Sequence, residues 1–208
     1  MFRTVLVHVR FADEGQACVV TFFGVDTGTR TLDEADQLFH DLVDRLRLPA
    51  RAVACTHLIR ARSAHVAVSL WVPPRFDGLW NELTRFAESE RAGVASGTGR
   101  SGRPELSAAA AEAAVEHVSR KGGRAVVFPG AAELTGTVIV GEVLARSAIT
   151  RLDVVGGHVE PGEDDLLDTR DHVRPEWRCG ELVLAVSPAG PGRFAPFEVP
   201  AHPGLAHR

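Results

Sequence analysis

The segment from residue 156 to residue 177, GGHVEPGEDDLLDTRDHVRPEW, is rich in side chains that could perform acid–base or metal chemistry. Carboxylate oxygens bind hard divalent cations, and a carboxylate beside an imidazole can act as an acid–base pair. We therefore predict two overlapping sets of functional residues. The candidate catalytic residues are His158, Glu160, Asp168, Asp171 and His172. The candidate ligands of a divalent metal are Glu163, Asp168 and Asp171.

Two other interpretations of this acidic segment remain open. In the first, it is an exposed loop that turns at Pro161-Gly162 and whose charges are simply solvated. In the second, its carboxylates meet an arginine-rich surface on another copy of the chain, as in a homodimer with charge-paired contacts.

The opening of the acidic segment, GGHVEPGE, resembles the start of a Nudix box, the metal-binding signature of hydrolases that act on nucleoside-diphosphate-linked substrates. Gly157 and Glu163 fit the first two fixed positions of the pattern G-x5-E-x7-R-E. The Arg-Glu pair of that pattern falls at Asp171 and His172, so the resemblance covers eight residues. It implies metal-dependent hydrolysis of such a substrate.

A second group of charges lies upstream, where the chain from Arg45 to Phe76 holds six arginines and no acidic residue. Guanidinium groups bind phosphate and carboxylate through paired hydrogen bonds. We predict Arg60, Arg62 and His65 as the binding residues for a small anionic ligand. The alternative is a solvated or self-associating sheet edge that uses arginine where other proteins use lysine.

The element that would position these arginines is a hairpin over residues 50–73. Two neighbouring runs alternate apolar and other residues with a period of two, which is typical of paired strands. The turn lacks the Asn-Gly or Asp-Gly pair that would fix its type. We predict a register in which Ile59 lies opposite Ala64. This register puts His57 opposite Val66 and predicts that His57 faces the core as a hydrogen-bonded packing residue.

Capping signals predict three helices around this hairpin. Thr31 and Glu34 form a capping box ahead of an amphipathic stretch that ends before Pro49. Asp77 begins a second amphipathic stretch. An alanine-rich helix over 104–121 follows the glycine-rich segment 93–103, for which we predict a flexible linker. The alternative for that segment is a backbone cradle for an anion at the helix N-terminus.

The order of elements predicts an α+β fold with an antiparallel or mixed sheet. The N-terminal part reads as a ferredoxin-like ββαββα unit, with strands at 4–11 and 16–25 and with the run at 124–128 as its final strand. The C-terminal part reads as mostly β. Its predicted strands cover residues 137–145, 149–155, 166–168 and 181–187.

These elements suggest four segments along the chain. We predict an α+β sandwich subdomain over 1–92, the flexible Gly/Ser/Arg linker over 93–103, a helix with an antiparallel sheet over 104–188, and a Pro/Gly-rich tail over 189–208. Phe194 and Phe197 could anchor this tail on the surface.

Composition limits the classes of function. The 208 residues are 45% hydrophobic and 24% charged, which is ordinary for a globular protein. The net charge of −4 argues against general nucleic-acid binding, which needs a concentrated positive face. The sequence shows no signal peptide and no apolar run of membrane-spanning length, so we predict a cytoplasmic protein without membrane contact. The cysteines Cys18, Cys55 and Cys179 have no C-x-x-C spacing and are predicted to be free thiols.

Two functional hypotheses follow from the sequence. The first is an enzyme or binding protein for a small anionic molecule, with Arg60 and Arg62 holding the anion and the acidic segment supplying proton or metal chemistry. The second is a non-catalytic accessory protein that binds a protein partner or a second copy of itself. The sequence contains no G-x-S-x-G or H-E-x-x-H motif, so catalytic residues would come from separate segments.

Overall fold

The computed structural model describes residues 21–60, 63–73, 78–97, 99–156 and 159–199. Several features predicted from the sequence lie outside these residues, namely the strand at 4–11, Cys18, Arg62, Asp77 and His158. The described part contains four α-helices, α1 (Leu32–Leu46), α2 (Leu79–Glu90), α3 (Pro104–Ser119) and α4 (Val140–Arg146), and one 3-10 helix, η1 (Ala131–Glu133). None of them is both long enough and apolar enough to cross a membrane.

Strands β1 to β6 lie in the N-terminal two-thirds of the chain, and β7 to β12 lie in the rest. The first group is β1 (Thr21–Thr29), β2 (Val53–Ile59), β3 (His65–Val72), β4 (Gly93–Ser96), β5 (Gly99–Gly102) and β6 (Arg124–Val127). The second group is β7 (Thr137–Ile139), β8 (Arg151–Val154), β9 (Leu166–Asp168), β10 (Glu176–Arg178), β11 (Glu181–Gly190) and β12 (Arg193–Pro196).

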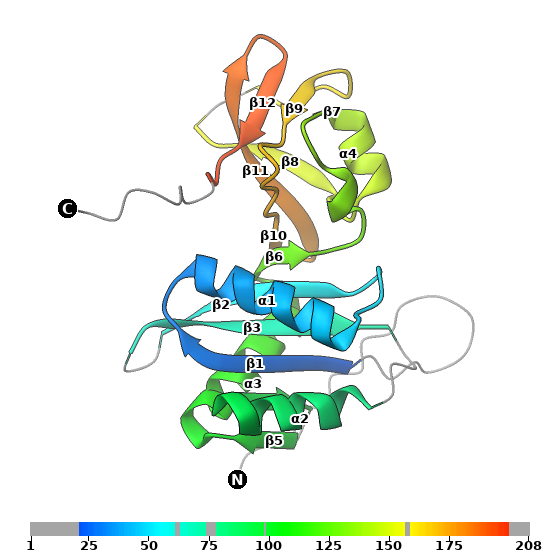
Figure 1. Cartoon of the computed structure of the whole chain (residues 1–208). Coiled ribbons are helices and arrows are strands. Elements are labelled where there is room, and N and C mark those ends of the chain that lie inside the picture. Colours follow the sequence, from blue (N-terminus) through cyan, green and yellow to red (C-terminus); the bar gives the residue numbers. More distant parts are fainter. Residues whose placement is uncertain (1–20, 61–62, 74–77, 98, 157–158, 200–208) are drawn as a thin grey trace, which may run out of the picture.

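Hydrogen bonds join these strands into one mixed sheet, so the fold is α+β. The order is β5-β4-β1-β3-β2-β6-β10-β11-β12-β9-β7, and β8 lies beside β11. Only the pairs β11–β8 and β12–β9 are parallel. Figure 1 shows that β7 to β12 and α4 form a body above β6, while β1 to β5 and the three longer helices lie below it.

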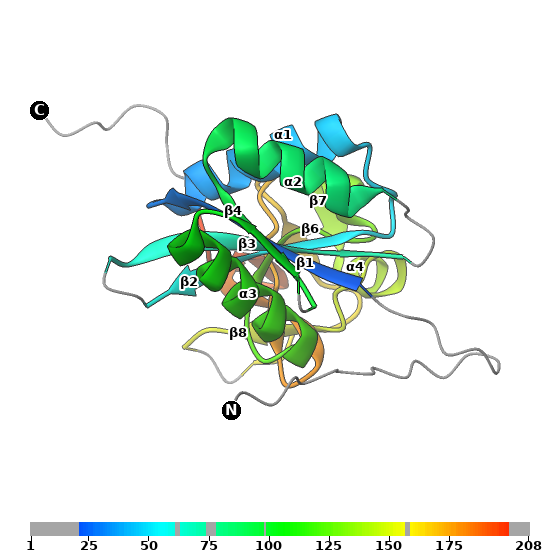
Figure 2. The ribbon, with the colours of Figure 1, turned by 90° about the horizontal axis from the view of Figure 1, so that it is seen from below.

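Helices cover both faces of the N-terminal strands, as Figure 2 shows. α1 and α2 pack on one face, where Phe39, Leu42 and Leu83 meet Val68 and Leu70 of β3 in a buried core. The predicted capping box is confirmed, because the Thr31 hydroxyl accepts from the Glu34 N–H while the Glu34 carboxylate accepts from the Thr31 N–H.

α3 packs on the opposite face at very short range. A Cβ atom on Gly24 of β1 would lie only 1.7 Å from the carbonyl oxygen of Ala110, and one on Gly93 would lie 2.1 Å from the Ser107 nitrogen. Ala109 and Ala113 are buried against Ala67 of β3. Glycine on the strands and alanine on the helix therefore let the two backbones approach closely.

A second core joins the two parts of the chain. Val53 and Cys55 of β2 are buried in the same cluster as Leu167 of β9, and Leu182 and Leu184 of β11. The face of β2 and β3 that carries α3 therefore also supports the C-terminal strands.

The predicted hairpin register is wrong by one residue. Ile59 pairs with His65, and His57 pairs with Ala67, because the connection between the strands is one residue longer than predicted. A shift of one residue exchanges the two faces of a strand. Ser69 therefore lies opposite Cys55, where the predicted register had placed a valine.

The residues predicted as a flexible linker form strands β4 and β5 instead. β4 pairs with β1, and its first residue, Gly93, is the one that lets α3 approach. Its glycine thus serves close packing rather than flexibility. The run at 124–128, predicted as the last strand of the N-terminal unit, forms β6. This strand pairs with the edge of β2 that faces away from β3.

Two predictions in the C-terminal part also need correction. Only Thr137–Ile139 of the predicted strand 137–145 is extended, and the chain then turns into α4, which buries Val140 and Val143 at helical spacing. The segment predicted as a tail contributes the end of β11 and all of β12, in which Phe194 is buried.

Candidate functional site

The described carboxylates of the predicted acidic site either accept hydrogen bonds from backbone N–H groups or are exposed to solvent. Asp171 accepts a hydrogen bond from the backbone N–H of Gly136 at 2.9 Å, and Asp168 accepts one from the N–H of Arg170 at 3.3 Å. Glu160 and Glu163 are exposed. These contacts are typical of a solvated loop whose acids stabilise its backbone.

The predicted metal ligands are not gathered at one point. Within the described ranges, no three or more His, Cys, Asp or Glu side chains lie in an arrangement that could hold a metal ion, and this includes Glu163, Asp168 and Asp171. The reason lies in the local chain path. Glu163 precedes β9, Asp168 ends that strand, and Asp171 sits in the following turn, where it is directed to Gly136.

Of the predicted anion-binding residues Arg60, Arg62 and His65, the structure describes Arg60 and His65. The arginines of residues 45–76 do not all lie near Arg60. Arg51 precedes β2 and Arg60 follows it, and a strand of this length separates its ends by about 20 Å. Both arginines are exposed. Arg51 and Arg60 therefore lie too far apart to bind one small anion together. The predicted joint binding by Arg60 and Arg62 stays a prediction, because Arg62 lies outside the described residues.

His65 is engaged within the protein. Its Nδ1 lies 2.8 Å from the Ser63 carbonyl oxygen and its Nε2 lies 2.8 Å from the Asp26 carboxylate, so both ring nitrogens face acceptors. Burial alone would lower the pKa of His65, but the hydrogen bonds to Ser63 and to Asp26 raise it above its ordinary value. His65 thus serves as the partner of a fully buried carboxylate.

His172 belongs to a buried ion cluster that the sequence did not predict. Its Nε2 lies 3.0 Å from the Glu198 carboxylate, which also accepts from Arg124. Arg124 in turn binds Asp36, which accepts from Arg174 as well. The cluster draws on α1, β6, the turn before β10 and the segment after β12, so no local spacing could have shown it.

Four buried polar side chains and the half-exposed Glu116 form a second polar chain between α3 and the sheet. The Glu116 carboxylate lies 2.7 Å from His57 Nδ1, and His57 Nε2 lies 2.7 Å from the Ser69 hydroxyl. Ser69 lies 2.8 Å from His117 Nδ1, and His117 Nε2 lies 3.8 Å from the Cys55 sulfur. If each histidine is neutral, every member except the terminal two donates one hydrogen bond and accepts one, from the thiol through to the carboxylate.

The pKa shifts agree with a neutral His117, a protonated Cys55 thiol and an ionised Glu116 in this chain. Burial lowers the pKa of His117 to about 3, with the nearby His57 and Arg120 acting in the same direction. Burial raises the pKa of the Cys55 thiol, and the hydrogen bond from His57 holds the pKa of Glu116 below its ordinary value. An acid, a histidine and a serine lie in the order of a catalytic triad, but Ser69 is fully buried, so a substrate could not reach it.

We expect acid to weaken the fold through this chain. The unfolded protein takes up a proton on His117 as the pH falls below 6.5, whereas the folded protein resists that proton until about pH 3. The free energy of unfolding should therefore fall by about 2 kcal/mol between neutral pH and roughly pH 5. Urea denaturation over this range measures the slope.

A variant pair identifies the group responsible for that slope. His117→Gln should flatten it, while His40→Gln, which changes an exposed histidine of α1, should leave it unchanged. His65 acts in the opposite sense, because its raised pKa gives stability that is lost as the pH rises past that value. An unchanged slope in His117→Gln would contradict the assignment.

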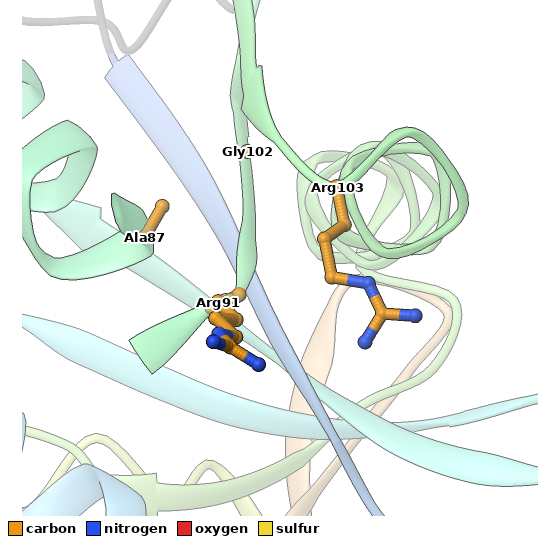
Figure 3. A pocket seen from close by; sticks show the side chains of 5 residues that line it. Ala87, Arg91, Gly102 and Arg103 are labelled. Atoms are coloured by element: carbon orange, nitrogen blue, oxygen red, sulfur yellow. The ribbon is translucent and has the colours of Figure 1, made fainter. Parts of the chain in front are cut away.

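A groove of about 540 Å³ opens between the end of α2, the end of β5 and the start of α3. It is lined by Ala87, Arg91, Ala92, Gly102 and Arg103. Figure 3 shows the two arginine side chains projecting from the end of α2 and the start of α3 beside Gly102. Neither of these arginines forms an ion pair with any other residue that the structure describes.

Gly102 sets the geometry of this groove. Its φ is +84°, and a Cβ atom there would lie 2.0 Å from the Ala92 carbonyl oxygen. The same oxygen accepts a hydrogen bond of 3.0 Å from the Arg103 N–H. The close approach therefore fixes the start of α3 against the end of α2.

Arg103 occupies the N-cap of α3, and no side chain caps the helix there. N-caps prefer residues that accept hydrogen bonds, and the helix dipole favours negative charge at this end. Arginine satisfies neither preference, although Glu105 supplies one acid in the first turn. The groove thus combines two guanidinium groups with the positive end of a helix of 16 residues.

A smaller groove of about 320 Å³ lies between α4 and β8. Val140, Leu144 and Leu152 give it apolar walls, and the predicted catalytic residue Glu160 stands at its side with Arg151. The other predicted catalytic residues in the described part do not line it.

The molecule is therefore a mixed α+β protein with an open, arginine-lined groove and two buried polar clusters. Comparisons with protein-family models, with curated proteins and with solved structures found no match to the chain.

Proposed function

We propose that the protein binds a small anionic molecule, with a phosphate or carboxylate group held between Arg91 and Arg103 in the groove between α2 and α3. The observation that carries this proposal is that two arginines line one open groove beside an uncapped helix start. This is the class of ligand expected from the sequence, bound at a different place from the hairpin.

The physical basis is the geometry of the guanidinium group. Its planar fork can donate two parallel hydrogen bonds to one carboxylate or phosphate, and such charge-assisted bonds are stronger than neutral ones. An anion placed there would also offset the charge conflict at the N-cap of α3. The proposal is for binding, since the predicted acid–base residues of the acidic segment lie elsewhere.

The test measures binding of inorganic phosphate, pyrophosphate and citrate by isothermal titration calorimetry at low ionic strength. Replacing both Arg91 and Arg103 with alanine should weaken binding of the best of these probes at least about tenfold, since a hydrogen bond to a charged group contributes about 1.5–3 kcal/mol. Added salt should weaken wild-type binding in the same titration.

The matched control removes two exposed charges from the arginine-rich stretch around the hairpin, namely Arg60 of the predicted site and Arg51 at the other end of β2. Arg51→Ala with Arg60→Ala should leave the affinity unchanged, because these exposed residues do not line the groove. If this control loses binding while the Arg91 and Arg103 variant keeps it, the anion binds at the hairpin and the proposal is wrong. Failure of all three probes to bind wild-type protein would also contradict it.

For the N-terminal unit we propose the ferredoxin-like arrangement. Its support is the succession β1-α1-β2-β3-α2-β4 together with the neighbour order β4-β1-β3-β2, in which adjacent strands are antiparallel. In this arrangement α1 and α2 cover one face of the sheet and α3 covers the other. α3 begins at the proposed groove and so links it to the rest of the molecule.

A further inference from the structure

Glu198, near the C-terminal end of the described chain, lies in a closely fitted basic site. Its two carboxylate oxygens accept from Arg124 Nε at 2.9 and 2.8 Å. One of them also lies 3.0 Å from His172 Nε2. A charged fork and an imidazole thus converge on a single carboxylate.

The site holds its shape through contacts that do not involve Glu198. Arg124 donates from Nη1 to one oxygen of Asp36 at 2.6 Å and from Nη2 to the other at 3.1 Å. Arg174 donates from Nε to Asp36 at 3.0 Å. Because Asp36 accepts from both Nη atoms of Arg124, the planar guanidinium group is held in one orientation. Its Nε–H therefore points to the position that the Glu198 carboxylate occupies. Arg124 itself is buried.

The chain around Glu198 contributes few other contacts. The side chains of Phe197 and Val199 are 57% and 53% exposed, so neither anchors the segment in the core. The Phe197 N–H donates one hydrogen bond to the Ala185 carbonyl. Docking of this stretch therefore depends mainly on one carboxylate.

The balance of charges in the cluster favours an anion at the position of the Glu198 carboxylate. Without Glu198, the cations Arg124 and Arg174 would face only one anion, Asp36, in a poorly solvated setting. Burial alone would raise the pKa of Glu198, but its bonds to Arg124 and His172 hold that pKa below its ordinary value, so the group is ionised at neutral pH.

The geometry points to a second ligand site in this protein: Arg124 and His172 form a carboxylate-binding site that the chain's own Glu198 fills and that accepts a free small carboxylate when Glu198 is removed. This site is separate from the groove between α2 and α3 and shares no residue with it. The exposed flanks of Glu198 mean that the chain can leave without disturbing the core.

Chemical rescue tests this inference. Glu198→Ala should lower the melting temperature by roughly 5 °C, since the variant leaves Arg124 without its second partner. Sodium formate or acetate, added to the variant, should recover at least half of that loss. Sodium chloride at the same ionic strength should recover little.

Two controls make the result specific. Wild-type protein should gain little from formate, because its site is filled, and Glu163→Ala, which removes an exposed carboxylate of the acidic segment, should neither lose stability nor respond. Adding His172→Gln to Glu198→Ala should reduce the response to formate. If Glu198→Ala melts like wild type, or if formate and chloride act equally on it, the carboxylate site is not there.

Discussion

Gly24→Ala is expected to destabilise the protein by about 3 kcal/mol or more, a large share of the stability of an ordinary domain. The added Cβ would lie 1.7 Å from the Ala110 carbonyl oxygen and 2.5 Å from the Ala110 carbonyl carbon. These are backbone atoms inside α3, so no rotamer change can relieve the contact. The helix must move away from β1 and lose its contacts along the sheet. Urea denaturation followed by circular dichroism measures the loss.

The control for Gly24→Ala is Gly162→Ala. A Cβ there would lie 3.5 Å from the Asp165 carboxylate, which is an ordinary contact, and stability should change by less than about 1 kcal/mol. Ala110→Gly should not rescue Gly24→Ala, because the obstructing atoms remain after the side chain is removed. Equal stability of the two glycine variants would show that α3 does not lie where the structure puts it.

Arg124→Met is expected to cost about 3–5 kcal/mol, because in a largely buried site Asp36 then keeps only Arg174 as its partner and Glu198 keeps only His172. Hydrogen bonds and charges from Asp36 and Glu198 raise the pKa of Arg124 against the lowering effect of burial, so the arginine is a fixed cation. Differential scanning calorimetry should show a melting temperature lower by roughly 10 °C or more.

The comparison for Arg124→Met is Arg85→Met, which breaks a solvent-exposed pair between Arg85 and Glu82 on α2. That change should cost between about 0 and 1 kcal/mol. Combining Arg124→Met with Asp36→Leu should recover part of the loss, because it removes a buried charge together with its partner. If Arg124→Met and Arg85→Met cost the same, the cluster is more hydrated than its geometry indicates.

The parts of the fold with local signals were predictable. The capping box of α1, the alternation of β2 and β3 and the alanine-rich α3 each depend on neighbours within a few residues, and all four elements form. The α+β class followed from them. The register of the hairpin was missed by one residue because its turn carries no residue pair that fixes the loop length.

The glycines of the segment 93–103 show why composition alone misled. Glycine indicates a flexible linker and a close backbone contact equally well, and only the position of α3 decides between them. The buried clusters had no sequence signal for a similar reason. Arg124 meets Asp36 across 88 residues of chain, and Ser69 meets His117 across 48.

Most of the charged residues predicted as functional from the sequence are exposed to solvent. Arg60, Glu160 and Glu163 are exposed, while the two arginines of the groove stood in a stretch with no charge pattern of its own. A signal was nevertheless present. The dipeptide Arg103-Pro104 marks a helix start with a cation at the cap, and such a mismatch with the helix dipole indicates a site for an anion.

The length of α3 is constrained at both of its ends. At one end the Arg103 N–H must lie beside the Ala92 carbonyl oxygen. At the other end the His117 ring must lie within hydrogen-bond distance of the Ser69 hydroxyl. One inserted or deleted residue between them would rotate one end against the other by about 100° and shift it by about 1.5 Å. Such a change would leave amino-acid composition and helix propensity almost untouched and still break either the groove or the histidine contact. For this helix, spacing therefore matters more than which small residue occupies each position.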